Sequence, residues 1–571
     1  MSINLAEPFA LKTWTLGALP LLQHVLDKLN VEALLGEYVA PRTRRVRLPP
    51  AVALGVLLRN IVLGRRALYG LGEWARDYDP ELLGLSGRAV ALLNDDRVGR
   101  ALDQLFDADR ASLMTAVVLQ AITEFGIELE QFHNDSTSIT FTGQYTQANG
   151  RKLRGKQALK ITEGHNKDHR PDLKQLLWIL TISDDGAMPI HYRVCDSNTT
   201  DDRTHIETWE TLRKLCNRAD FLYIADCKLC TREQMGHIAG NGGRFITILP
   251  RTRKEDAWFR QHIQDHNITW REVIHEPNPR RVDSADNIWC VTDLALCSAE
   301  GYRMVWVFSS LKAESDQNAR LKALEKTYAQ IEVLNEKLKG KRTRLKERGQ
   351  VFEATQAILK QTGAQRWVDV DIVEHSDVSY QQKGAGRPGP NTGYEKKIRT
   401  RFEVLYKPNA EAITYDAKSD GMFPLITNCK AEALSPEEVL KKYRYQPKLE
   451  KRHEQLKTVY AVAPAFLKNE GRIEALLLLY FLALLVQALI ERQVRLGMAA
   501  EGVDVLPLYP ENRDCRAPTA NRIFEVFQPV QRHELVRDST LVQRFDPELT
   551  PLQHHLLRLI GAPRESYPGT D

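Results

Sequence analysis

"IELEQFHNDSTSITFTG", residues 127–143, decides the fold class because apolar and polar residues alternate in it on both sides of Asp135. An alternation of period two is typical of a β-strand with one buried face. The continuous apolar run at 176–183 predicts a central strand, and residues 187–194 predict its neighbour after a turn. The next elements alternate between helix and strand, with helices at residues 201–216 and 232–240 and strands at 221–227 and 244–250. This alternation predicts an α/β fold, a mixed sheet flanked by helices.

The segments around this sheet have other patterns. Leucines at helical spacing predict a helical accessory domain over residues 1–120. The first part of the core occupies 121–250, and an α+β insertion over 251–430 interrupts it. We expect the insertion to hold β pieces and one long basic helical stretch, about 312–362, with Leu321, Leu324, Tyr328, Ile331 and Leu338 at heptad-like spacing. The core resumes over 431–500, and a helical tail follows over 501–571.

Composition narrows the class of protein without assigning a function. The 571 residues are 43% hydrophobic and 27% charged, as in soluble globular proteins. With 79 basic and 74 acidic residues the net charge is +5, so local clusters must indicate any polyanionic partner. Eight cysteines and no recognisable signal peptide favour a cytoplasmic location. The apolar run at 475–490 contains Gln487 and is short for a membrane span, so we predict a buried core helix and no membrane association.

Three carboxylates stand where a sheet edge can bring them together. Asp135 lies within one predicted strand, Asp226 ends a second, and Glu450 lies on a helix that begins near Pro447. Such a group suits two Mg²⁺ ions, ~3.5–4 Å apart, which stabilise the attacking and leaving oxygens of a phosphoryl displacement. Taken singly, each residue also has an ordinary structural interpretation: a hydrogen-bonded turn, a helix cap, or an ion pair of Glu450 with His453.

The stretch "KYRYQPKLEKRHEQLK", 442–457, carries a family resemblance. Tyr443, Gln446, Glu450 and Lys457 have the spacing of the Y-(2)-R-(3)-E-(6)-K signature of bacterial insertion-sequence transposases, which are DDE enzymes on a ribonuclease-H-like core. Gln446 departs from the signature arginine, and Arg444 and Lys448 flank it. Residues 164–176, 419–428 and 93–109 also resemble segments of this family, so the resemblance covers nearly the whole chain.

The resemblance implies a function and a set of site residues. Asp135, Asp226 and Glu450 correspond to the metal-binding catalytic triad, with two Mg²⁺ ions for which Mn²⁺ substitutes. Tyr443, Gln446, Lys457, Arg444 and Lys448 are then expected to contact DNA. Seven residues are close to two helical turns, so Glu450 and Lys457 are expected to share a helix face. The remaining cations of the stretch, Arg452 and His453, would contact the DNA backbone.

The implied activity is DNA transposition. A metal-activated water hydrolyses a phosphodiester at each element end, and the freed 3′ hydroxyl attacks target DNA. The expected partners are the terminal repeats, target DNA and a second copy of the chain, as a homodimer on DNA. The alternatives are a catalytically inactive DNA-binding relative and a Mg²⁺-dependent nuclease of the same fold.

Three weaker signals remain open. Four arginines within residues 41–50 stand between prolines, either in a solvated linker or on a surface that reaches outward. Trp258 or Trp270 is a candidate for stacking on a DNA base, with burial as the alternative. The loop "KGAGRPGPN", 383–391, contains a Gly-Arg-Pro core similar to minor-groove hooks.

Overall fold

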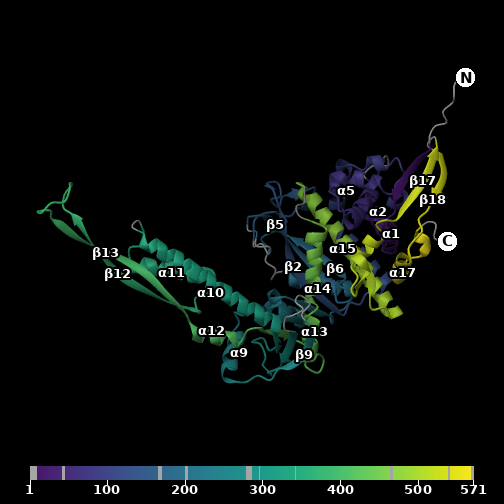
Figure 1. Ribbon diagram of the computed structural model, residues 1–571. Coiled ribbons are helices and arrows are strands. Elements are labelled where there is room, and N and C mark those ends of the chain that lie inside the picture. The colour runs from purple at the N-terminus through teal and green to yellow at the C-terminus, as the bar shows by residue number, and fades with distance from the viewer. Residues whose placement is uncertain are drawn as a thin grey trace. The chain divides into compact units, whose positions relative to one another are not determined.

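The structure is a computed structural model of the whole chain (Figure 1). It describes residues 9–41, 46–164, 170, 172–199, 204–277, 286–294, 296–340, 343–462, 467–537 and 540–567. Two compact units divide the chain: Met1–Thr247 together with Lys442–Asp571, and Ile248–Lys441. Most of the arginine-rich segment (42–45) and part of the stretch 164–176 (165–169 and 171) lie outside the described residues.

The first unit contains a mixed sheet of strands in the order β6-β5-β2-β7-β8. The strands are β2 (Gln131–Phe141), β5 (Lys174–Ser183), β6 (Pro189–Cys195), β7 (Leu222–Ala225) and β8 (Arg244–Ile248). The three strands β2, β5 and β6 are antiparallel neighbours, whereas β7 runs parallel to both β2 and β8. Helices α7 (His205–Cys216) and α8 (Arg232–Gly240) make the crossovers that parallel strands require. The predicted mixed α/β class is confirmed.

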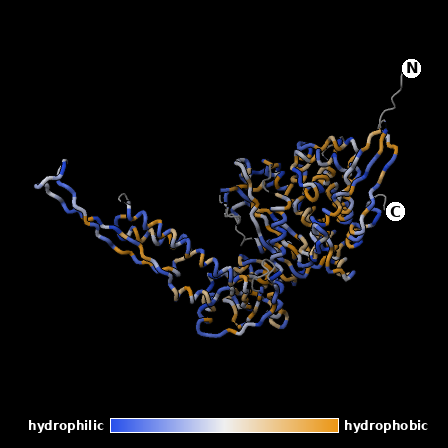
Figure 2. The backbone as a smooth tube through the Cα atoms, viewed as in Figure 1, coloured by the Kyte–Doolittle hydropathy of each residue, from blue (hydrophilic) through white to orange (hydrophobic). Residues whose placement is uncertain are grey.

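The core of this unit is built around α15 (Glu470–Glu501), which begins at the N-cap Asn469 and ends at Gly502 in the left-handed conformation. Among the described residues it is the one helix that is long and apolar enough to cross a membrane, yet 83% of its most apolar window is buried in the protein. The ring of Tyr192 stacks between Trp178 and Phe481, at 4.8 Å from each ring centroid. The predicted burial of this helix is confirmed, and Figure 2 shows apolar segments concentrated in the same unit.

Short helices of the N-terminal region complete the first unit: α1 (Leu19–Lys28), α2 (Val31–Tyr38), α3 (Pro50–Arg59), α4 (Leu71–Arg76), α5 (Asp95–Asp107) and α6 (Arg110–Phe125). The side chain of Asn94 caps α5 by accepting from the Arg97 amide at 2.9 Å, as the sequence predicts. The two glutamates near the start of α15 are buried and ion-paired, Glu470 with Arg151 at 2.9 Å and Glu474 with Arg110 at 2.8 Å.

The C-terminal segment differs from the expected helical tail. It contains α16 (Ala520–Phe527) and α17 (Pro551–Ile560), but also β15 (Leu506–Tyr509), β16 (Arg513–Cys515), β17 (Gln531–Arg537) and β18 (Thr540–Phe545). Strand β17 pairs with β18 and with β1 (Ala10–Thr15), so the two ends of the chain form one three-stranded sheet. The sequence interpretation missed this sheet because its strands are short and largely polar.

The second unit has an antiparallel sheet in the order β14-β11-β10-β9. Its strands are β9 (Arg271–Glu276), β10 (Asn287–Thr292), β11 (Arg303–Ser309) and β14 (Met422–Thr427), with helices α9 (Lys254–Asp265) and α12 (Ala410–Ala417). The stretch predicted as one long helix is two helices, α10 (Ser310–Lys339) and α11 (Arg348–Thr362), because α10 ends at Gly340. Two 15-residue strands, β12 (Val368–Gln382) and β13 (Tyr394–Pro408), then form a long hairpin.

Candidate active site

The two aspartates follow one another across adjacent parallel strands of the first unit. Asn134 of β2 is in register with Ala225, the last residue of β7. Asp135 and Asp226 are the residues that follow them in the sequence. Neighbouring strands lie ~4.8 Å apart, so both carboxylates leave the sheet at the same place. Both residues are partly exposed.

Local hydrogen bonds fix the backbone at Asp226. Its side chain accepts from the Lys228 amide at 3.0 Å and caps a short 3₁₀ turn, Cys227–Leu229. Its carbonyl oxygen accepts a 2.6 Å bond from the hydroxyl of Thr247 at the end of β8. Asp226 therefore does cap the following turn, as its structural interpretation predicted. The cap also orients its carboxylate, which lies at the same sheet edge as Asp135.

Glu450 comes from α14 (Gln446–Glu454), which packs on β2 and β5. Its neighbour Leu449 is fully buried against the sheet, whereas Glu450 is exposed. Burial of part of its side chain and the charge of Asp135 raise the pKa of Glu450 above its usual value. The helix therefore brings a third carboxylate within electrostatic reach of the first.

Tyr443 is the last residue of the preceding helix, α13 (Pro436–Tyr443). Burial raises the pKa of its phenol, and the negative charges of Asp226, Asp135 and Glu450 raise it further. The phenol stays protonated at any working pH and can donate a hydrogen bond.

Gln446 has a clear structural role in this arrangement. Its Nε2 donates to the Asn134 carbonyl at 3.3 Å, and its Oε1 lies 2.8 Å from Nδ1 of His133. On the other side, Nε2 of His133 lies 2.7 Å from the amide nitrogen of Gln131, whose Oε1 accepts from the Lys442 ammonium at 3.0 Å. Burial lowers the pKa of His133 to about 4, so the ring is neutral and carries its proton on Nδ1.

These four bonds form a relay in which every donor has one acceptor, from Lys442 through Gln131 and His133 to Gln446 and the β2 backbone. Gln446 is only 8% exposed, and its amide is engaged inside the protein. The relay joins the start of α14 to the strand that carries Asp135. The predicted contact of Gln446 with DNA stays a prediction, as no described contact tests it.

The other predicted DNA contacts lie on the surface of the same segment. Lys448 is exposed, and burial of its stem together with the nearby charges of Lys451 and Arg495 lowers its pKa. Arg444 is partly exposed. Lys457 lies in a π-helical turn, Gln455–Val459, closed by a 3.0 Å bond from the Tyr460 amide to the Gln455 carbonyl. This turn holds more residues than an α-turn, so it rotates Lys457 from the direction expected for an unbroken α-helix.

Two residues expected to contact DNA are instead buried. Arg452 donates to the carbonyls of Gly186 and Ala187 and forms a 2.9 Å ion pair with Glu491, in which both side chains are under a tenth exposed. His453 is buried as well, with Nε2 3.9 Å from Oδ2 of Asp135, rather than paired with Glu450. The prediction of DNA-backbone contacts by Arg452 and His453 is therefore wrong.

The donor set suits a hard divalent cation. The triad offers carboxylate oxygens, which Mg²⁺ and Mn²⁺ prefer. Among the residues that the structure describes, no three His, Cys, Asp or Glu side chains already lie close enough to hold a metal ion. Closing the triad around an ion would therefore require these side chains to move nearer to one another.

A comparison with protein families matches the N-terminal part of the chain. The sequence model described as "Domain of unknown function (DUF4277)" matches residues 11–119. No curated protein matches the sequence. One solved structure that resembles the chain is a piggyBac transposase synaptic complex with hairpin DNA, with 9% identity and a TM-score of 0.38, covering 89% of this chain and 80% of that one. From a likeness at this TM-score we draw nothing about fold or activity.

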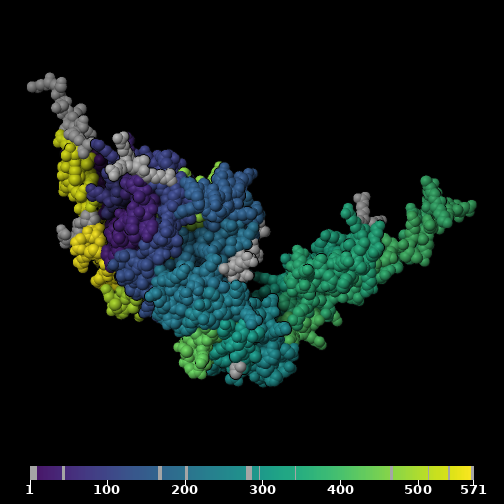
Figure 3. All heavy atoms as spheres, turned by 180° about the vertical axis from the view of Figure 1, so that it is seen from behind, coloured from purple at the N-terminus to yellow at the C-terminus, as the bar shows by residue number. Residues whose placement is uncertain are grey.

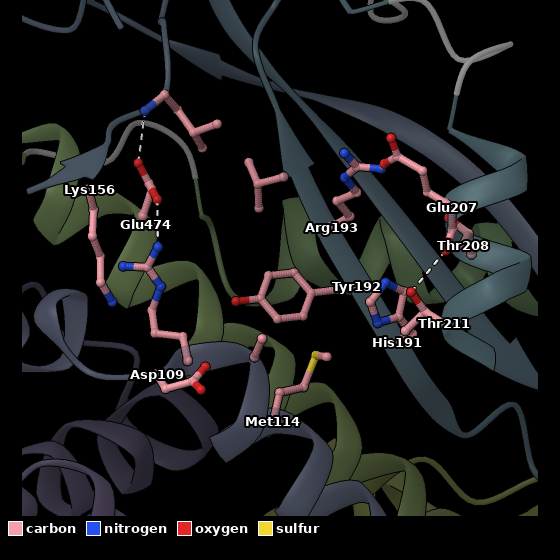
Figure 4. Close-up of a pocket in the computed structure, with 14 residues that line it drawn as sticks. Asp109, Met114, Lys156, His191, Tyr192, Arg193, Glu207, Thr208, Thr211 and Glu474 are labelled. Carbon is pink, nitrogen blue, oxygen red and sulfur yellow. Dashed lines mark hydrogen bonds and ion pairs between the residues drawn. The ribbon is translucent and has the colours of Figure 1, made fainter. Parts of the chain in front are cut away.

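Two other places bear on the site. A cavity of about 460 Å³ in the first unit lies along β6 (Figure 4), but none of the eight predicted site residues lines it. Two of its cations are paired with acids, Arg110 with Glu474 and Arg193 with Glu207. In the second unit, Trp258 is 44% exposed and stacks on His262 at 4.7 Å, so its predicted role with a DNA base stays open.

Proposed function

We propose that this protein is a DNA transposase of the DDE type, encoded by a bacterial insertion sequence. It hydrolyses the phosphodiester at each element end and joins the freed 3′ hydroxyl to target DNA. The observation that carries the proposal is that Asp135 and Asp226 follow register partners on the parallel strands β2 and β7, while Glu450 on α14 lies within electrostatic reach of Asp135. The mixed sheet that carries the two aspartates supports a ribonuclease-H-like core.

The three carboxylates would hold two Mg²⁺ ions, or Mn²⁺ in their place. When bound, the ions supply the charge that stabilises the attacking and leaving oxygens of an in-line displacement at phosphorus. The protonated phenol of Tyr443 donates to a non-bridging phosphate oxygen beside the triad. Lys448, Arg444 and Lys457 bind the DNA backbone by charge, which positions the scissile bond without reading sequence.

Two ends have to be held together for strand transfer, so the active species is a homodimer on DNA. It acts on the terminal repeats and on target DNA in the bacterial cytoplasm, associated with the nucleoid when bound. The resemblance of residues 442–457 to the transposase signature supports these further steps.

The test is a cleavage and strand-transfer assay on the DNA that flanks the gene, with Mg²⁺ or Mn²⁺. Asp135→Asn, Asp226→Asn and Glu450→Gln should each lower end cleavage by roughly 100-fold or more, because each removes a negative charge that would hold a metal ion beside the reacting phosphate. Asn at 226 keeps an oxygen that can accept from the Lys228 amide, so the local turn survives. All three variants should still bind element ends.

The matched control is Glu454→Gln, an exposed acid one turn beyond Glu450 on the same helix, which should cleave like the wild type. If any triad variant keeps full cleavage, the triad is assigned wrongly. Wild-type protein that binds ends but never cleaves them would identify a DNA-binding relative. Cleavage without joining of precleaved ends to a target plasmid would identify a nuclease.

A further inference from the structure

The outer half of the β12–β13 hairpin, Ser376–Thr400, stands clear of the rest of the second unit (Figure 3). At its base the hairpin is packed, since Ile372, Phe402 and Val404 form a core with α10 and α11. That cover ends where α10 ends, and Arg399 donates to the Gly340 carbonyl at 2.6 Å at this point. Beyond it, both faces of the two-stranded ribbon are exposed.

An uncovered two-stranded ribbon is unusual because such a hairpin is only marginally stable alone in water. The face that continues the buried base carries two cross-strand pairs, Val378 with Ile398 and Tyr380 with Lys396. Ile398 is 62% exposed and Tyr380 is 68% exposed. This partly apolar face extends into solvent over seven residues, or roughly 23 Å. An exposed apolar surface of this kind indicates a contact with another molecule.

The charge of this arm indicates a polyanion. Its 25 residues carry five basic side chains against two acidic ones, Asp377 and Glu395. The basic residues are Lys383, Arg387, Lys396, Lys397 and Arg399. In the whole chain the two signs nearly balance, at 79 to 74, so the imbalance belongs to the arm. Contact with a second copy of the same arm would set these cations against each other, since a two-fold interface pairs the same patch with itself.

The tip of the arm is shaped for a close approach. Gly384 and Gly386 have φ of +131° and +136°, a conformation that favours glycine, and a Cβ at either would meet nothing within 4 Å. A 2.7 Å bond from the Gly389 amide to the Thr392 hydroxyl closes the turn. Between them, Arg387 is followed by Pro388, which restricts the backbone. Arginine is the residue most attracted to a narrow minor groove, and proline is one of the wedges used there.

We propose that the arm Ser376–Thr400 is a DNA-binding ribbon that places Arg387 in the minor groove and rests Lys396 and Lys397 on the flanking phosphates. This inference rests on the proposed function only in taking duplex DNA as the partner. It adds a contact surface in the second unit that is separate from the triad.

The test uses the full chain and 30-base-pair duplexes, with affinity measured by fluorescence anisotropy between 50 and 200 mM salt. The double variant Lys396→Gln/Lys397→Gln should lower the salt slope by about 2, at ~0.9 per phosphate contact. Over this range the wild type should therefore lose about twelvefold more affinity than the variant. The matched control, Lys322→Gln/Lys326→Gln, removes the same charge from the exposed surface of α10 and should leave the slope unchanged.

Arg387→Gln should lower the ratio of the affinity for A·T-rich duplexes to that for G·C-rich duplexes roughly fivefold, since this preference is read in the minor groove. Arm variants with the wild-type slope, or a wild type that binds no duplex, would overturn the inference. So would arm variants that bind DNA normally but lose dimers in light scattering, because the partner would then be a second copy. If the double variant lowers the salt slope as expected but the wild type never cleaves DNA, the proposed function is refuted and the inference about the arm stands.

Discussion

Replacing Gln446 with arginine restores the family signature and should damage this protein. The acceptor Oε1 of Gln446 faces the Nδ1 proton of His133 at 2.8 Å, and arginine has only donors to offer there. If His133 moved its proton to Nε2, the mismatch would pass to Gln131 and then to the Lys442 ammonium, which can only donate. Either arrangement leaves two donors of the relay facing each other.

The cost follows from the burial of the relay. His133 is fully buried, and a buried donor without an acceptor costs about 1–3 kcal/mol. A guanidinium at a position only 8% exposed adds desolvation, so we expect a loss of at least about 3 kcal/mol in the local stability of α14. Gln446→Glu keeps an oxygen that accepts from His133, and the positive charge of Lys442 at the far end of the relay partly offsets its negative charge. It should therefore cost less stability than Gln446→Arg.

Hydrogen exchange of the α14 amides measures this local stability directly. A loss of about 3 kcal/mol should speed their exchange roughly a hundredfold, since each 1.4 kcal/mol is a factor of ten. The control Lys448→Arg adds an arginine to the same helix at an exposed position and should stay within about 0.5 kcal/mol of the wild type. If Gln446→Arg exchanges like this control and cleaves DNA faster, the relay is unimportant and position 446 contacts phosphate.

Two further predictions concern buried charge in the first unit. Burial lowers the pKa of His191 to about 4, so the unfolded chain binds more protons between pH 4 and 6.5. Stability should therefore be complete above pH 6.5 and fall by about 3 kcal/mol as the pH drops to 4, and His191→Phe should flatten this part of a urea-unfolding profile. Arg452→Leu should cost about 3–5 kcal/mol in the same assay, because it leaves Glu491 buried without this partner, whereas Lys448→Ala should cost under about 0.5 kcal/mol. Equal effects of these two substitutions would show that Arg452 is not enclosed.

The sequence was sufficient to predict the strands that carry the two aspartates, because alternation and apolar runs are local signals. Asp135 lies inside β2 and Asp226 directly after β7, as predicted, and Glu450 lies on a helix with Pro447 in its first turn. The break of the long helix at Gly340 was missed because the charged pattern on both sides is equally helical.

Long-range pairing could not be predicted. Strand β1 finds its partner β17 more than 500 residues away, and neither has a strong pattern of its own. The same limit applies to the basic stretch 442–457, where the cations look alike in sequence. Packing alone distinguishes Arg452, enclosed by carbonyls and Glu491, from Lys448, which faces solvent.

Helix α14 separates charge in a way that suits an anionic substrate. On one side, burial and the charge of Asp135 raise the pKa of Glu450, and burial together with the charges of the three acids raises the pKa of the Tyr443 phenol. On another side, burial and the like charges of Lys451 and Arg495 lower the pKa of Lys448, so an anion bound there would relieve repulsion. A phosphate diester with its cations satisfies both sides at once, because metal ions neutralise the carboxylates and the backbone neutralises the lysines. Either substrate or metal alone leaves one of these clusters uncompensated, so we expect the binding of each to favour the other.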